Sequence, residues 1–509
     1  MILLVVLSVL ATLGNASAND VTKPNIVIMY MDDMGWGDIG ANGNWAKETP
    51  NIDKMASEGM LFPSFYSAAP ICSPSRAALM TGRLPIRNGF YSTNRHGVNA
   101  YTPQTIVGGI TETEYLLPQL LKEGGYKSKI IGKWHMGHRP DYLPLNRGFD
   151  EFFGSPNCHF GPYDDVKTPN APVYKDDLML GRYYTNYTIH KGLSNLTQIF
   201  IKEGTDFIEN QAKAGNPFLL YWTPDANHQP AYSSEMFWGK SRRDSSYGDS
   251  VMEVDYGVGV ILAKLKELNI EQNTLVFFSS DNGAEGIAGK AGGSNGPLLC
   301  GKQTTFEGGM REPGIAWWPG TIKPGVISPQ LGTTMDILVT AVGVAGLQLP
   351  SDRIYDGIDL FPVLSGKVES IERPVWYYRG NELFAVRVGQ YKAHLWTWSH
   401  EHYNFCPGEY VKDVTTPDQV NRTSNPIVIN LDNDPGEKYT ITSGARFKEA
   451  MALINPYLQE HRDTMVRGEP SLNYCDKMVM NWAPRGCEEI NYCLQGPTTS
   501  SIKLCGWDH

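Results

Sequence analysis

After its first residues, the sequence lacks any apolar run that approaches the roughly 18 uninterrupted positions of a membrane-spanning helix. It also lacks excess positive charge, because 44 Lys and Arg stand against 54 Asp and Glu, a net charge of −10. This argues against a general nucleic-acid or membrane-surface binder, although one site can still be basic and take an acidic substrate. Gly and Pro, 52 and 33 of 509 residues, stay below low-complexity levels, and no internal repeat is evident. We therefore expect a soluble globular protein.

The start of the chain predicts a secretory route. Residues 2–13 form one apolar run, and Ala16-Ser17-Ala18 follows as a small-residue cleavage site, so residues 1–18 are interpreted as a signal peptide. The alternatives are a buried N-terminal strand or a membrane anchor, which needs about 20 apolar residues. Three N-glycosylation sequons, at Asn186, Asn195 and Asn421, agree with this route.

Helical and strand patterns alternate over the first 300 or so residues. Short apolar runs at 25–31, 217–223 and 274–280 are typical of strands that are covered on both faces. Helical patterns lie between them, at 51–59, 75–81, 113–124, 197–214 and 249–268. This order predicts an α/β core, with a large, mostly parallel sheet flanked by helices.

The pattern of the sequence changes after Arg373. Short aromatic segments at 375–379, 383–389 and 392–398 predict a smaller antiparallel sheet. From Cys475 onward the chain is irregular and rich in cysteine, which predicts a disulfide-stapled tail. The expected divisions are 1–18, 19–372, 373–474 and 475–509.

Acidic residues follow two of the predicted strands. Asp32 and Asp33 end the first, and Asp281 and Asn282 end the strand at 274–280. Ligands of open α/β sheets gather at the carboxyl ends of strands, where these oxygens would form a site for Ca²⁺ or Mg²⁺. No His-x-x-x-His or cysteine cluster accompanies them, which disfavours zinc. The alternative is that both motifs are simply turns.

Cys72 stands just before a predicted helix that Pro74 and Ser75 would open. A nucleophile at the positive end of a helix is well placed to hold an anion. The alternative is a buried cysteine or half of a disulfide, since eight cysteines invite four bridges.

Four blocks of sequence carry a family resemblance. Residues 72–76 (CSPSR) with Thr81-Gly82, residues 125–135 (GYKSKIIGKWH), residues 302–313 (KQTTFEGGMREP) and residues 434–437 (DPGE) occur in that order. They resemble the sulfatase family. The resemblance implies an alkaline-phosphatase-like fold, a catalytic domain over 19–372, and a cysteine oxidised to formylglycine by a formylglycine-generating enzyme during secretion. Related folds with Ser or Thr at this position are phosphatases or phosphodiesterases, which the cysteine disfavours.

The resemblance also implies roles for individual residues. It places Ca²⁺ on Asp32, Asp33, Asp281 and Asn282, with formylglycine at position 72 approaching the ion and Arg76 holding the hydrated aldehyde or the metal ligands. One oxygen of that hydrate would attack sulfur. Stabilising cations and acids are then expected at Lys133, His135, His228 and Lys302. His228 and Lys302 would protonate the departing sugar oxygen, and His135 would be the base that releases sulfate.

Further segments narrow the expected substrate. Residues 155–163, 293–312 and 481–484 resemble the lysosomal members that act on 6-sulfated N-acetylgalactosamine or galactose at the ends of chondroitin and keratan sulfate. The family also suggests a homodimer. Histidines with a pKa near 6.5 would be mostly protonated in an acidic compartment, which predicts an acidic pH optimum. The alternatives are an arylsulfatase-like enzyme with another sulfated substrate, and a non-catalytic glycan-binding protein. No nucleic-acid or membrane partner is expected.

Candidate sugar contacts are less specific. Tyr101 matches a family active-site position, with a core tyrosine as the alternative, and His138, Tyr174 and Asp225 are weaker candidates. The resemblance pairs the remaining cysteines as Cys300–Cys406, Cys475–Cys505 and Cys487–Cys493, leaving Cys158 outside a disulfide. The sequence alone allows many other pairings.

Overall fold

The computed structural model describes residues 23–159, 161, 163–187, 192–400, 405–406 and 410–507. The predicted signal peptide lies outside these residues. Within them, no helix is both long enough and apolar enough to cross a membrane.

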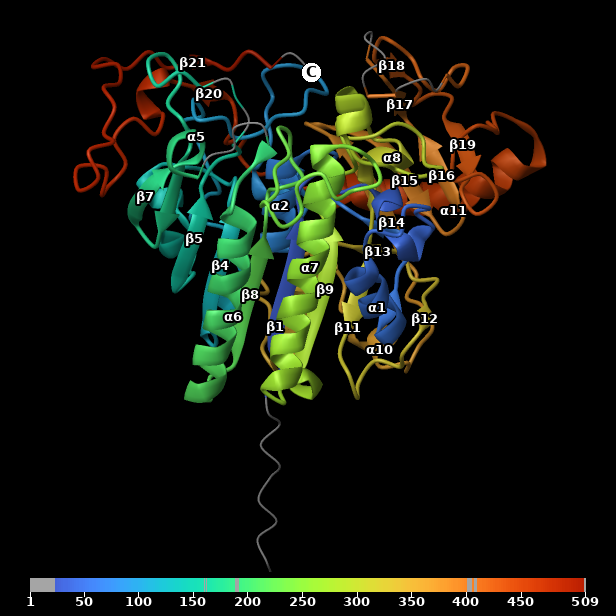
Figure 1. The fold of residues 1–509 in the computed structure, drawn as a ribbon. Coiled ribbons are helices and arrows are strands. Elements are labelled where there is room, and N and C mark those ends of the chain that lie inside the picture. The colour runs from blue at the N-terminus through green and yellow to red at the C-terminus, as the bar shows by residue number, and fades with distance from the viewer. Residues whose placement is uncertain are drawn as a thin grey trace, which may run out of the picture.

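A ten-stranded mixed sheet forms the centre of the molecule (Figure 1). Its strand order is β12 (Val326–Ile327), β2 (Met60–Leu61), β11 (Ile315–Trp317), β9 (Thr274–Ser280), β1 (Asn25–Met31), β8 (Phe218–Thr223), β4 (Lys127–Lys133), β5 (Glu151–Ser155), β6 (Pro172–Lys175), β7 (Leu178–Arg182). The five strands from β9 to β5 are parallel, whereas β11, β6 and β7 pair antiparallel. The prediction of a large, mostly parallel sheet is confirmed.

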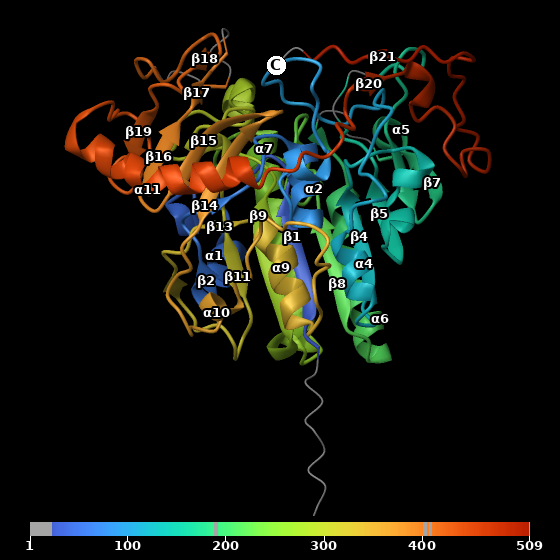
Figure 2. The same ribbon diagram turned by 180° about the vertical axis from the view of Figure 1, so that it is seen from behind.

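Alternating residues of β1 pack into two separate cores. Ile26, Ile28 and Tyr30 face α2 (Cys72–Thr81), α4 (Leu117–Lys122) and α9 (Met335–Val344). Val27 and Met29 face α1 (Pro50–Glu58), α6 (Leu196–Ala214) and α7 (Ser246–Glu267). Figures 1 and 2 show these two helix layers from opposite sides. A strand covered on both faces is apolar throughout, which is why the sequence pattern of β1 was continuous rather than alternating.

The register of β1 on β9 brings the two acidic motifs together. Asn25 pairs with Thr274 and Met31 pairs with Ser280, so the next residues, Asp32 and Asp281, leave the sheet side by side. The predicted juxtaposition of two strand ends is therefore present in the fold.

The predicted helices are present with shifted boundaries, and two of the differences have a clear local cause or consequence. The helix predicted to begin near Pro74 begins at Cys72, with Ile71 as its N-cap, so Cys72 lies in its first turn. The helical pattern at 113–124 gives only Leu117–Lys122, because Pro118 takes an early helical position and residues 111–116 form turns.

The predicted second sheet is also present. It contains β14 (Pro374–Arg379), β15 (Glu382–Val388), β16 (Tyr391–His394) and β19 (Ile427–Asn430), all antiparallel, and α11 (Gly444–Asp463) packs against it. The three disulfides implied by the resemblance are present: Cys300–Cys406, Cys475–Cys505 and Cys487–Cys493.

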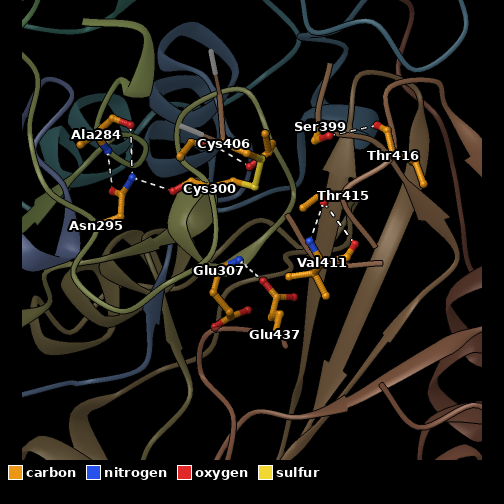
Figure 3. Close-up of a disulfide and its surroundings, with 12 residues drawn as sticks. Ala284, Asn295, Cys300, Glu307, Ser399, Cys406, Val411, Thr415, Thr416 and Glu437 are labelled. Atoms are coloured by element: carbon orange, nitrogen blue, oxygen red, sulfur yellow. Dashed lines mark hydrogen bonds between the residues drawn. A yellow bond between two sulfur atoms is a disulfide. The ribbon is translucent and has the colours of Figure 1, made fainter. Parts of the chain in front are cut away.

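A buried charge network joins this sheet to the larger domain. Lys392 Nζ lies 3.0 Å from a carboxylate oxygen of each of Glu307 and Glu437, and it donates to the Thr305 carbonyl at 2.9 Å. The Glu437 carboxylate also accepts from the Glu307 amide at 2.7 Å (Figure 3). Against the effect of burial, Lys392 holds the pKa of Glu307 down at about 2.

We expect Lys392→Met to lower the free energy of unfolding by about 3–5 kcal/mol, because it leaves buried carboxylates without their cation. Denaturant-induced unfolding measures the effect. The control is Lys202→Met, which removes an exposed ion pair with Asp206 and should change stability by no more than about 0.5 kcal/mol. Equal effects of the two substitutions would contradict the structural importance of the network.

Candidate active site

Buried acidic groups meet at the carboxyl ends of β1 and β9. Asp32, Asp33, Asp281 and Asn282 are all almost completely buried. The Asn282 Nδ2 donates to Asp33 Oδ1 at 2.8 Å, and the Asp33 amide donates to Asp281 Oδ1 at 3.2 Å. The structure therefore brings all four predicted metal ligands together.

Three cationic side chains surround these acids. Arg76 reaches Asp281 Oδ2 at 2.7 Å from α2, and Lys133, the last residue of β4, reaches Asp32 at 2.8 Å. Lys302, from the loop after β9, lies 2.7 Å from Asp33 Oδ2. Each buried carboxylate thus has a cationic partner, which compensates for the loss of hydration.

The acids do not share one protonation behaviour. Burial opposes ionisation of Asp32, but Lys133 and Arg76 keep its pKa well below the ordinary value. Burial is the dominant effect at Asp281 and raises its pKa to about 7, despite the neighbouring Arg76. A carboxyl with a raised pKa among other carboxylates indicates a place where another positive charge is favourable.

The donor set fits a hard divalent cation. Asn282 Oδ1 is buried and has no hydrogen-bond partner among the described residues. Ligand atoms of Asp32, Asp33, Cys72 and His228 all lie within 4.8 Å of one another. Carboxylate and amide oxygens suit Ca²⁺ or Mg²⁺, and an orphan buried amide oxygen is the kind of group that such an ion would satisfy.

Cys72 opens α2 and faces this cluster. Every residue of α2 is buried, and the Ser75 hydroxyl is anchored to the Tyr30 hydroxyl at 2.9 Å. Burial raises the pKa of the Cys72 thiol well above its ordinary value, in spite of Lys133 and Lys302. The unmodified thiol is therefore not an activated thiolate nucleophile.

His228 and Lys302 form a hydrogen-bonded pair. His228 Nδ1 lies 2.8 Å from the Gln229 carbonyl, which can only accept, so Nδ1 carries a proton. The other nitrogen, Nε2, lies 3.4 Å from Lys302 Nζ and can accept from it. Burial, together with Lys302, lowers the pKa of His228 to about 3, so the ring is neutral and the proton of the pair resides on the lysine.

His135 is held in a neutral form with both ring nitrogens buried. Neither nitrogen has a hydrogen-bond partner among the described residues, and the backbone is left-handed, with φ of 60°. Burial, Lys133 and Arg76 lower its pKa well below the ordinary value. The prediction of protonated histidines is therefore wrong for His135 and His228, because desolvation and neighbouring cations disfavour a further positive charge.

A cavity of about 480 Å³ opens above the cluster. Cys72, Tyr101, His135, His228 and Lys302 line it, so five of the residues predicted from sequence meet at one opening. Its wall also contains groups that the sequence did not single out: Ile71, Cys158, Gly161, Gln229, Pro230, Glu285, Gln303, Phe405.

Three predicted sugar contacts do not reach this cavity. His138 and Tyr174 line a separate cavity of about 450 Å³ next to residues 479–485. Asp225 is fully buried, and its carboxylate accepts hydrogen bonds from Tyr183, Tyr232 and His159. The three side chains thus lie away from the cavity above Cys72, because loop residues near an active-site motif can also serve its packing.

His159 is a site residue that sequence reasoning missed. Its Nδ1 lies 2.9 Å from Asp225 Oδ2 and its Nε2 lies 3.2 Å from the Pro230 carbonyl, and both partners can only accept. The buried ring therefore links the Asp225 carboxylate to the Pro230 carbonyl, and Pro230 lines the cavity above Cys72. Its centroid lies 5.6 Å from that of His228. The resemblance block at 155–163 contained His159, but nothing in that block indicated its pairing with Asp225.

The loop that carries Lys302 is fixed from several sides (Figure 3). The Asn295 side chain donates to the carbonyls of Cys300 and Ala284 and accepts from the Ala284 amide. Cys300 is bonded to Cys406 of the second domain. Because Lys302 stands two residues beyond this disulfide, the second domain helps to position a cation of the site.

Comparison with known families agrees with this geometry. Residues 24–347 match the sulfatase family model, and residues 370–495 match the model of the C-terminal region of aryl-sulfatase. The chain belongs to the sulfatase family and is a sulfuric ester hydrolase.

The similar proteins include sulfatases that match most or nearly all of the chain. N-acetylgalactosamine-6-sulfatase of Canis lupus familiaris is 55% identical, over 99% of this chain and 98% of that protein. Arylsulfatase A of Bos taurus is 37% identical, over 82% of this chain and 83% of that protein. Among solved structures, the PsFucS1 sulfatase from Pseudoalteromonas sp. superposes with a TM-score of 0.73 at 30% identity, covering 88% of this chain and 92% of that one.

We expect His159→Gln to lower kcat for sulfate release by about 10–100-fold, the range seen when a partner that orients a site ligand is removed. Glutamine is neutral and cannot donate to Asp225 and the Pro230 carbonyl in the same geometry. Sulfate release from a 6-sulfated galactoside measures the effect. The control is Tyr184→Phe, which removes only a hydrogen bond to the His159 backbone carbonyl. Full activity of His159→Gln would show that the buried ring has no part in positioning the site.

Proposed function

We propose that this protein removes the 6-sulfate from terminal N-acetylgalactosamine 6-sulfate and galactose 6-sulfate residues of chondroitin and keratan sulfate in the lysosome. The observation that carries the proposal is one buried constellation of Cys72, acids and cations at the base of an open cavity. Identity of 55% over nearly the whole chain to an N-acetylgalactosamine-6-sulfatase supports the choice of sulfated sugar. Exposure of Asn186, Asn195 and Asn421 is compatible with glycosylation on a secretory route.

Residue 72 would act after oxidation to formylglycine. This group, when formed, supplies a hydrated aldehyde whose oxygen can attack sulfur. The raised pKa of the Cys72 thiol supports a precursor role, because the thiol itself is poorly activated. Arg76 lies one helical turn after residue 72 on α2. Asp281 and Asp32 hold its guanidinium, and the guanidinium in turn fixes these carboxylates, which border residue 72.

Asp32, Asp33, Asp281 and Asn282 would hold Ca²⁺. The ion, when bound, supplies positive charge that eases loss of a proton from a neighbouring hydroxyl and draws in the sulfate oxygens. Lys133 and Lys302 add fixed charge on either side of the acids. They give the entering sulfate monoester a preorganised electrostatic environment.

The histidines would divide the proton transfers between them. Lys302 carries the proton of its pair with His228, so this pair can protonate the departing sugar oxygen. His135 is neutral, and neither of its ring nitrogens has a hydrogen-bond partner among the described residues, so one of them can accept a proton. Tyr101, Glu285 and Gln303 on the cavity wall are placed to contact the sugar.

The first test asks whether residue 72 is modified and is needed for sulfate release. We expect wild-type protein from a secretory host to carry a modified residue 72, and Cys72→Ala to abolish sulfate release while leaving the fold intact. Peptide mass spectrometry, sulfate release from N-acetylgalactosamine 6-sulfate and circular dichroism are the measurements. A 4-sulfated sugar and an aryl sulfate serve as comparison substrates. Wild-type protein with an unmodified thiol and no sulfate release would refute the proposal, and preference for another ester would redirect the substrate assignment.

The second test concerns pH and the cation. Burial raises the pKa of Asp281 to about 7, so protons compete with the ion below that pH. We expect the apparent Ca²⁺ affinity of chelator-treated protein to fall with decreasing pH, by up to about tenfold per unit below pH 7. Calorimetric titration across this range measures it.

The matched variant for this second test is Asp281→Asn, which should bind Ca²⁺ more weakly and with a flatter pH dependence. An equally steep dependence in Asp281→Asn would assign the proton to another group. Full activity after complete removal of divalent cations would refute the metal site.

A further inference from the structure

A second cavity adjoins the nucleophile cavity through a shared tyrosine. It measures about 300 Å³ and is lined by Tyr101, residues 103 and 105, and parts of the tail, including Lys477, Lys503 and Trp507. Tyr101 also lines the cavity above Cys72. Its ring lies 6.3 Å from that of His135 on one side and 5.5 Å from that of Trp507 on the other. Tyr101 is therefore a wall that the two cavities have in common.

A pair of short strands and a disulfide form the walls of this second cavity, which we call the tail cavity. β20 (Tyr474–Cys475) and β21 (Lys503–Leu504) pair antiparallel, and Cys475 is bonded to Cys505. The tail is fastened to the segment after Tyr101, because the Val107 amide donates to the Tyr474 carbonyl at 2.9 Å and the Asp476 amide donates to the Thr105 carbonyl at 2.7 Å.

Two lysines flank that disulfide symmetrically. Lys477 stands two residues after Cys475, and Lys503 stands two residues before Cys505. Both are exposed, and neither forms an ion pair with a carboxylate of the described residues. Their positive charge is therefore available to a ligand, and the disulfide holds both lysines at the same cavity.

The acid that lines the cavity is already engaged. Asp476 accepts hydrogen bonds from the amides of Met478 and Ser501 and from the Ser500 hydroxyl. These bonds lower the pKa of Asp476 and use its oxygens within the tail. Asp476 therefore stays ionised, and the cavity offers a ligand two cations against this one hydrogen-bonded anion, beside the rings of Tyr101 and Trp507.

We infer that the tail cavity is a binding subsite for the anionic sugar next to the sulfated terminal residue. It would take the carboxylate or sulfate of that sugar on Lys477 and Lys503, with its ring against Trp507. The inference rests on the proposed function, since it needs a sulfated sugar whose 6-sulfate points to residue 72. On this inference, contacts with the cysteine-rich tail make the protein bind the end of a polymer more tightly than a single sugar.

The test compares substrates that do and do not reach the tail cavity. We expect Lys503→Gln and Lys477→Gln each to lower kcat/KM by about threefold to fivefold on a 6-sulfated trisaccharide with a uronate at the second position, through KM. The double variant should lose roughly tenfold or more, and high salt should lower wild-type activity toward the level of the variants. Activity on N-acetylgalactosamine 6-sulfate should not change, which also shows that the variants fold.

Two controls complete the experiment. Lys448→Gln removes an exposed lysine of α11, outside the tail, and should leave both substrates unaffected. A trisaccharide with a neutral second sugar should be hydrolysed equally by wild type and variants, and one with a sulfated second sugar tests the other anion.

Equal activity of wild type and double variant on both anionic trisaccharides would overturn the subsite, as would an equal loss on the monosaccharide. If wild type releases sulfate from none of these sugars, the proposed function fails and the subsite falls with it. Failure of the subsite alone is therefore distinguishable, because wild type then cleaves every substrate.

Discussion

The structure depends on balancing buried charge at the ends of two parallel strands. Asp32, Asp33 and Asp281 lie together away from water, an arrangement that isolated carboxylates would not tolerate. Arg76, Lys133 and Lys302 make it possible, and each comes from a different element: α2, β4 and the loop beyond β9. The same charges that stabilise the folded site would also receive a sulfate ester, so packing and chemistry use one set of residues.

The second domain also contributes to this balance of buried charge. Glu437 lies in the 434–437 turn, and its carboxylate accepts from the Glu307 amide while lying 3.0 Å from Lys392. Glu307 opens the short α8 (Glu307–Met310), only a few residues after Lys302. The Cys300–Cys406 disulfide holds the other side of the same loop. A largely buried turn that resembles a family motif therefore helps to position the loop that carries Lys302.

The sequence allowed much of this arrangement to be predicted, but not all of it. Continuous apolar strands ending in Asp or Asn were sufficient to place Asp32 and Asp281 at one edge, because strand pairing converts sequence position into spatial position. The role of Asp225 was mistaken, since its carboxylate is used by His159 and two tyrosines that are distant in sequence. Protonation of His228 was also mistaken, because its burial and the proximity of Lys302 are tertiary properties. A local sequence pattern shows neither the contacts with residues distant in sequence nor the charges that lie nearby in the fold.

Backbone conformation shows how firmly the rest of the structure holds the site. Asp33, His135, Cys300 and Gln303 all have left-handed backbone, with φ between 55° and 76°. Each such residue costs on the order of 1–3 kcal/mol and persists only where its surroundings determine it. Here the surroundings are the charge pairs of Asp33, the buried strand end before His135 and the bridged loop around Cys300. Folding energy from the two domains is thereby used to preorganise the acids, His135 and the loop that carries Lys302 before any substrate enters, which is the condition for electrostatic stabilisation of a charged transition state.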